Sequence, residues 1–162
     1  MANKDIIEKK YFKNNTRFSN IFNYYLYDGK KIIKEDNLRE LDTKLVLTSP
    51  VLSNRERDIY KKAVIKTDGK FTYLLLGIEN QTKADSTMVL RNNLYDLMSY
   101  FNQLEAVEKN KNFDKIKVNI YPVITFVIYY SPKPWNTYKD LYSMFGIEDN
   151  EILKKYVSNY KR

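Results

Sequence analysis

The sequence contains no cysteine and no histidine among its 162 residues. The missing cysteines exclude disulfide bonds, thiol nucleophiles and thiolate metal ligands. The missing histidines exclude imidazole bases and a Ser-His-Asp triad. Any chemistry must therefore use carboxylates, lysine, tyrosine or hydroxyl groups. The metal that suits such oxygen ligands is a hard cation, Mg²⁺ or Mn²⁺.

Long hydrophobic runs are missing as well. The longest apolar run, residues 123–130, falls far short of the about 20 residues that a membrane-spanning helix needs. The first ten residues, MANKDIIEKK, alternate charged residues with two isoleucines and contain no apolar signal region. We therefore expect a cytoplasmic protein with no membrane partner.

Positive charge is what the chain has in excess, with a net charge of +8. Such an excess suits a polyanionic partner, most often a nucleic acid, although it also serves solubility alone. The length and the 43% hydrophobic content suit one domain with its own core. We expect a single domain over residues 1–162: a short N-terminal helix at 1–13, a core at about 14–131 and a C-terminal helical segment at 137–162.

Hydrophobic periodicity predicts the elements of that core. Helical spacing predicts helices over residues 16–28 and 86–108, the second with Ser86 as its cap and a stripe of Leu90, Leu94, Leu97, Met98, Phe101 and Leu104. Extended segments are expected at 38–47, 58–67, 71–81 and 121–130, the last as a buried strand. Two short helical patterns, 138–145 and about 150–160, end the chain. This order predicts an α/β (α+β) fold with a mixed sheet of about four strands and helices on its faces.

One hairpin in this scheme brings two acidic residues together. Asp68-Gly69 between two strand-like runs is a strong hairpin signal. Asp58 and Glu79 each lie about ten residues from that turn, so we expect them at the same end of the hairpin. Side chains alternate along a strand, which places Gln81 on the face of Glu79 and leaves Asn80 to contribute only its backbone carbonyl.

Two neighbouring carboxylates repel each other unless a cation or a proton lies between them. A divalent metal bound by Asp58 and Glu79 would resolve this repulsion, and its bound water could attack a phosphodiester, with Gln81 orienting that water or a phosphate. The alternative is structural, because strand ends often carry polar residues only where they meet solvent.

Five stretches carry a resemblance to a known family: RFSNIFNYYLYDGKKIIKEDNLRELD, RERDIYKK, YLLLGIENQT, VLRNNLYDLMSY and YPVITFVIYYSPKPWN. In this order the chain resembles the PD-(D/E)XK nuclease family transposases, the recombination-promoting nucleases of bacterial mobile elements. The resemblance implies a restriction-endonuclease-like α-β-β-β-α-β core and magnesium-dependent DNA cleavage. It also implies a further helical region after residue 162, so we expect this chain to be shorter than its longer relatives.

The resemblance assigns roles to individual residues. Asp58 takes the place of the motif aspartate, Glu79 that of the motif glutamate, and Gln81 that of the usual lysine. The Asn80 carbonyl would complete the metal site, and Asn20 stands where relatives often have an acid in the first helix. Asp42, at the end of another extended run, is the rival for the motif aspartate.

Three further residues are candidates for contacts with DNA. Lys62 has the strand parity of Asp58, and Arg91 and Tyr95 share one face of the helix at 86–108, from which they could reach a phosphate. Arg91 packed on the Tyr95 ring is the structural alternative. The lysines at 9 and 10 are expected to form a solvated surface.

We therefore expect a Mg²⁺- or Mn²⁺-dependent endodeoxyribonuclease. A nuclease-like fold that only binds DNA or a protein partner, because catalysis is weakened by Gln81 and Asn20, and a truncated remnant are the alternatives. The sequence leaves open whether the chain forms a homodimer.

Overall fold

The protein is built on a four-stranded sheet with the strand order β1-β4-β5-β6. The computed structural model describes residues 2–45, 55–67, 70–109 and 118–160. The strands are β1 (Leu38–Glu40), β4 (Ile59–Thr67), β5 (Lys70–Gln81) and β6 (Val123–Tyr129). Strands β1, β4 and β5 are antiparallel neighbours, whereas β6 runs parallel to β5. The predicted mixed four-stranded sheet is therefore confirmed.

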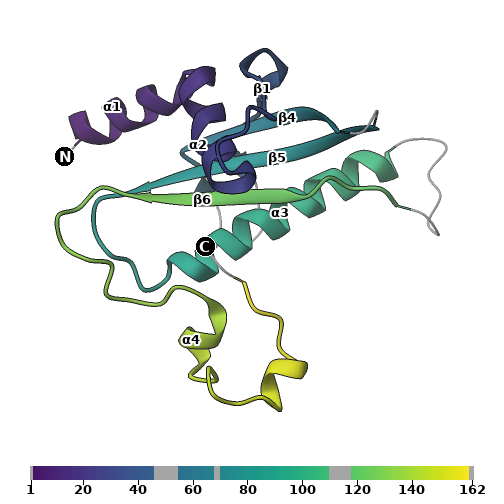
Figure 1. The fold of residues 1–162 in the computed structure, drawn as a ribbon. Helices are drawn as coiled ribbons and strands as arrows, with labels where there is room; N and C mark the ends of the chain where they lie inside the picture. Colours follow the sequence, from purple (N-terminus) through teal and green to yellow (C-terminus); the bar gives the residue numbers. More distant parts are fainter. Residues whose placement is uncertain (1, 46–54, 68–69, 110–117, 161–162) are drawn as a thin grey trace.

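Helices cover both faces of this sheet (Figure 1). Helices α1 (Ala2–Lys13) and α2 (Asn15–Tyr27) lie on one face, and α3 (Met88–Glu108) crosses the other between β5 and β6. A crossover is required at this point because two parallel neighbouring strands cannot be joined by a tight turn. The helices and strands thus follow the predicted order.

Two short strands form a separate ladder beside the main sheet. Strands β2 (Lys44–Leu45) and β3 (Arg55–Glu56) pair antiparallel, and the ladder continues when the Arg57 N–H donates to the Thr43 carbonyl. The sequence indicated only one extended run over residues 38–47. The β4–β5 hairpin pairs from Ile59 with Ile78 to Thr67 with Lys70. The predicted Asp68-Gly69 turn lies outside the described residues.

The face under α1 and α2 is an apolar core. Ile59, Ala63 and Ile65 of β4 and Leu74, Leu76 and Ile78 of β5 alternate toward this face and meet buried Phe12, Phe18, Phe22, Ile33 and Leu38. The Phe22 ring stacks on that of Phe126 with 4.5 Å between centroids. Alternation of side chains along two paired strands produces this layer directly.

The predicted helix over residues 86–108 is present, but its cap and its buried face differ from the expectation. Ser86 is not the cap: α3 begins at Met88, because the Asp85 carboxylate accepts from the Thr87 N–H (2.8 Å) and hydroxyl (2.7 Å). The side turned toward the sheet carries the polar residues Asn92, Asp96 and Ser99, whereas Leu97 and Phe101 are exposed. The helical spacing of the leucines therefore predicted the helix correctly, but it did not predict which side of the helix packs on the sheet.

The C-terminal half also departs from prediction in detail. Strand β6 lies at the edge of the sheet and is mostly half-buried, so the prediction of a buried strand was wrong. Helix α4 (Leu141–Phe145) begins later than predicted because Asp140 caps it, and Gly146 ends it at φ 67°. The predicted helix at 150–160 is only one 3₁₀ turn, η2 (Leu153–Lys155). Within the described part of the chain, no helix is long and apolar enough to cross a bilayer.

Candidate active site

The site lies where β4 begins and β5 ends. The pair Ile59–Ile78 closes the ladder, so Asp58 and Glu79 are the next residues opposite each other. The Asp58 N–H approaches Glu79 Oε1 at 3.4 Å, and the Asn80 N–H donates to Asp58 Oδ2 at 2.7 Å. Asp58 and Glu79 therefore meet as the count from the hairpin turn predicts.

Asn80 contributes its backbone to this edge. In an extended strand the N–H and C=O of one residue point to the same side, and the Asn80 N–H points to Asp58. The Asn80 carbonyl thus faces the side of β5 on which Asp58 lies. The ladder opens here because the Arg57 N–H, which would otherwise meet β5, donates to Thr43. The Asn80 side-chain amide is buried and has no hydrogen-bond partner among the described residues.

Glu79 is a carboxyl group almost cut off from water. The residue is 2% exposed, and burial, with the neighbouring Asp58 carboxylate as the second cause, raises its pKa to about 8. Arg57 and Arg91 oppose this shift without cancelling it. Burial and the second carboxylate therefore outweigh two guanidinium groups, and the site favours any additional positive charge between Asp58 and Glu79.

One such positive charge comes from α1. Lys9 Nζ lies 3.0 Å from Asp58 Oδ1. Lys9 and Asp58 also line, with Asn80, Gln81 and Thr82, a pocket of about 260 Å³. The expectation of a solvated Lys9 is met only in part, because its side chain is 41% exposed but its amino group pairs with Asp58. No sequence signal could have found this contact, because Lys9 and Asp58 lie about fifty residues apart in the chain and meet only when α1 packs against the sheet.

Gln81 and Asp42 both lie at hollows that Asp58 shares. Gln81 lines the pocket just described, while Asp42 lines an adjacent one with Lys9, Asp58 and Tyr60. The rival Asp42 therefore lines a pocket next to the site, on the segment that follows β1. Asp58 accepts from the Asn80 N–H, approaches Glu79 and pairs with the Lys9 ammonium, so it lies at the strand edge where the candidate ligands meet.

Of the three residues predicted to contact DNA, Arg91 and Tyr95 lie beside the site and Lys62 lies farther along the sheet. Lys62 Nζ lies over the rings of Tyr73 and Tyr121, at 4.3 and 4.8 Å from their centroids, four residues along β4 from Asp58. Arg91 is bonded to Asp85 at 2.8 Å and to the buried Tyr95, and its charge still acts on Glu79. Arg91 and Tyr95 therefore contact each other beside the site, which is the structural alternative given for this pair.

Sequence reasoning missed the buried arginine next to Asp58. The Arg57 side chain is fully buried and forms an ion pair with Asp96 Oδ1 at 2.7 Å. Its guanidinium also donates to Thr125 Oγ1 and, at 3.3 Å, to Ser99 Oγ. The Tyr160 hydroxyl donates to the other oxygen of Asp96 at 2.6 Å. A charged residue in the stretch RERD is typical of an exposed position. The side chains that accept hydrogen bonds from Arg57 lie 39 or more residues away in the chain, so the sequence did not reveal them.

Gly77 makes room for this guanidinium. A Cβ at position 77 would clash with the Arg57 side chain and lie 2.8 Å from Thr125 Oγ1. The glycine in GIENQ is therefore explained by the buried arginine, which fixes the backbone immediately before Asp58.

The oxygen donors fit a hard divalent cation in their chemistry. Two carboxylates and one backbone carbonyl lie at one strand edge, and the neighbouring Asp58 carboxylate adds to burial in raising the pKa of Glu79. Among the described residues there is no group of three or more acidic side chains that could hold a metal. A metal here would rely on Asp58, Glu79, the Asn80 carbonyl and solvent.

The sequence matches no protein-family model, and no curated protein and no solved structure is significantly similar to the chain.

Proposed function

We propose that the protein is a metal-dependent endonuclease of the PD-(D/E)XK type, acting on DNA and associated with recombination or mobile elements. The observation that carries this proposal is the meeting of Asp58 and Glu79 at the open end of the β4–β5 hairpin. The resemblance of the five sequence stretches supplies the restriction-endonuclease-like assignment, and the net charge of +8 supports a polyanionic substrate.

In this proposal Asp58, Glu79 and the Asn80 carbonyl hold Mg²⁺ or Mn²⁺. A bound divalent cation supplies an activated water and stabilises the charge that develops on a phosphodiester. Gln81 lies in the pocket beside Asp58, where its amide can orient that water or a phosphate oxygen. Lys9 brings a positive charge to the same pocket, which Gln81 cannot do.

A second function has its own observation. Lys9 already neutralises Asp58, and Glu79 with a pKa of about 8 is mostly protonated at neutral pH. A site balanced in this way does not need a metal. The same fold would then bind DNA through its positive charge and leave it intact.

Plasmid cleavage tests the proposal. With Mg²⁺ or Mn²⁺ the wild type should nick supercoiled DNA, and Asp58→Asn and Glu79→Gln should each lose about 100-fold or more. The reason is that a lost metal ligand removes several kcal/mol of charge stabilisation and each 1.4 kcal/mol is about a factor of ten. Asp42→Asn and Lys62→Met are the matched controls and should keep activity.

The same experiments decide between the nuclease and the DNA-binding function. Salt-dependent DNA binding by a wild type that never cleaves would replace the nuclease with the binding function. Loss of cleavage in Asp42→Asn, with Asp58→Asn unaffected, would transfer the catalytic role to the rival aspartate. Titration with Mn²⁺ alone, followed by its electron paramagnetic resonance signal, reports binding without needing turnover.

A further inference from the structure

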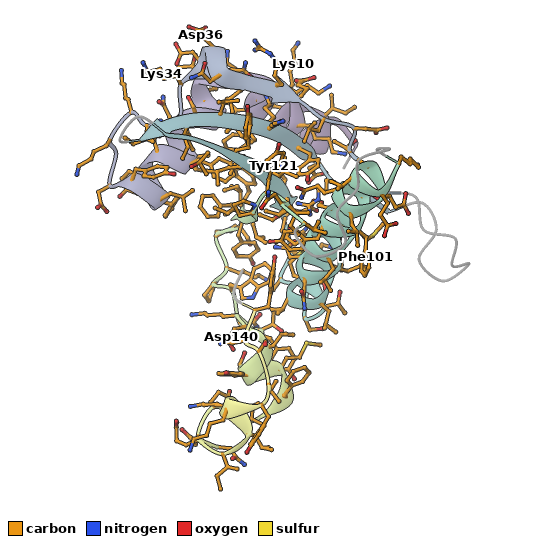
Figure 2. The ribbon with its side chains drawn as sticks, turned by 90° about the vertical axis from the view of Figure 1, so that its right-hand side faces the viewer. Lys10, Lys34, Asp36, Phe101, Tyr121 and Asp140 are labelled. Carbon is orange, nitrogen blue, oxygen red and sulfur yellow. The ribbon has the colours of Figure 1, made fainter. Side chains whose placement is uncertain are left out.

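The outer face of α3 carries an apolar stripe that the fold leaves exposed. Leu90, Leu97 and Phe101 are 44%, 46% and 62% exposed, and Leu94 and Leu104 between and beyond them are half-buried. Figure 2 shows Phe101 on the side of α3 away from the strands. We call these five residues the α3 seam.

The seam is opposite the side of the helix that the sheet covers. With about 100° per residue, Asn92, Asp96 and Ser99 fall on one side of α3, and Leu90, Leu97 and Phe101 fall on the other. The buried side also carries Met88, Val89, Tyr95 and Met98, so α3 has apolar residues on both sides, whereas a surface helix of a globular protein normally keeps its apolar stripe on the core. A contiguous exposed apolar stripe of this kind marks an interaction surface.

The spacing of the seam specifies what fits it. Its residues follow one another at intervals of four, three, four and three positions. This alternation is the pattern by which one helix packs along another with interlocking side chains. The occupant is therefore an α-helix with an apolar stripe of its own.

The charges at the ends of α3 favour a second α3 in the opposite direction. Glu105 and Glu108 are exposed in the last turn, where the helix dipole disfavours carboxylates, and Lys109, 4.0 Å from Glu105, offsets only one of them. The first turn has no acidic residue, exposed Lys83 lies just before it, and Asp85 between them is offset by its ion pair with Arg91. An antiparallel partner helix brings its positive end to these carboxylates, whereas a parallel one brings four carboxylates together.

We propose that the α3 seam is the contact between two copies of this chain, packed antiparallel about a two-fold axis near Leu97. Such a contact is self-complementary, so it closes on a dimer and does not propagate. It leaves the Asp58–Glu79 end of the hairpin outside the interface and does not depend on the proposed nuclease activity.

The oligomeric state gives the first test. Analytical ultracentrifugation over a concentration series should show a monomer–dimer equilibrium for the wild type. Phe101→Glu and Leu97→Glu should shift it to monomer by at least about 100-fold in dissociation constant, because each substitution would bury two unpaired charges in the interface of the dimer. Tyr24→Glu, at an aromatic 68% exposed on α2, is the matched control and should leave the dimer intact.

The absence of cysteine allows a test of direction. Leu90→Cys and Leu104→Cys lie 14 positions apart, which is about 21 Å along a helix and beyond a short bismaleimide. A mixture of the two single-cysteine proteins should form cross-linked heterodimers, whereas neither alone should cross-link efficiently. Circular dichroism spectra confirm that every variant keeps its fold.

The contrary outcomes are distinct. A wild type that stays monomeric at all concentrations overturns the proposal, as does a dimer that survives both glutamate substitutions. Efficient cross-linking of Leu90→Cys with itself would replace the antiparallel arrangement with a parallel one and overturn the charge argument.

Discussion

The two faces of the sheet differ in the kind of side chain that they bury. Under α1 and α2, aliphatic side chains of β4 and β5 meet Phe18 and Phe22, and the layer is apolar apart from a few bonded polar groups. Under α3, the buried layer contains Arg57, Glu79 and Asp96. The first face gains from the removal of apolar surface from water, and the second depends on each charge keeping its partner.

Lys61 is a charged residue buried on the apolar face. Its side chain is fully buried, and Nζ donates to the Lys13 carbonyl (2.6 Å) and to Asn15 Oδ1 (2.7 Å). Burial lowers its pKa. Here the charge is held at the junction of α1 and α2, whereas on the α3 face charges occupy the centre of the layer.

The largest expected effect comes from breaking the ion pair at the centre of the α3 face. Asp96→Ala should lower the free energy of unfolding by about 3–5 kcal/mol, because it leaves the buried Arg57 guanidinium without its counterion. Urea denaturation measures this loss. Glu148→Ala, at an exposed position outside α3, is the control and should change stability by less than about 0.5 kcal/mol.

The double variant Arg57→Met/Asp96→Leu sharpens the comparison. If the α3 face depends on matched charges and not on charge as such, removing both should restore most of the stability lost in Asp96→Ala. A double variant as unstable as Asp96→Ala would show instead that the hydrogen bonds to Thr125, Ser99 and Tyr160 carry the energy.

A second, pH-dependent effect is expected from Glu79. Its folded pKa of about 8 lies above the unfolded value, so the folded protein keeps a proton that the unfolded chain releases. Stability from this group is present below about pH 4.5, falls as the pH rises, and levels off above about pH 8. Since one pKa unit corresponds to about 1.4 kcal/mol, Glu79→Gln should stabilise the protein by a few kcal/mol at pH 8 and by little at pH 4. Thermal unfolding across this pH range measures the effect, with Glu148→Gln at an exposed position as the control. If the stability of both variants changes with pH in the same way, the expectation is contradicted.

The smallest effect is expected at the edge of the same network. Tyr160→Phe removes a 2.6 Å hydrogen bond to Asp96 and should cost about 1.5–3 kcal/mol, because the acceptor is charged and buried. Burial raises the pKa of Tyr160, so the bond persists through neutral pH. Tyr156→Phe, at an exposed tyrosine of the same segment, should be neutral in the same denaturation experiment, and equal losses in both variants would show that Asp96 does not depend on Tyr160.

Much of the fold followed from local patterns. Strand alternation and the Asp-Gly pair predicted the β4–β5 hairpin, and helical spacing predicted α2 and α3 to within about two residues at most ends. Capping was less predictable: Ser86 and Thr87 are both suitable, and the position of Asp85 decides between them. The C-terminal segment had helical spacing, but it forms only α4 and a 3₁₀ turn.

The candidate site divides in the same way. Asp58 and Glu79 could be paired by counting from the turn, since hairpin register is a local property. Lys9 and Arg57 could not be placed, because their partners lie on elements brought together only by packing. Lys62 had the right parity for the site, but its amino group lies on two tyrosine rings farther along the sheet.

By itself, the sequence determined the β4–β5 hairpin, the strand β6, the helical period of α3 and the end of the sheet at which the acidic residues meet. These depend on residues close together in the chain. Only the tertiary structure decided which face of α3 turns inward, that Arg57 is buried beside Gly77, and that a lysine from α1 pairs with Asp58. The reason is physical: the energy of a buried charge depends on its partners, and those partners are separated in sequence by up to 68 residues.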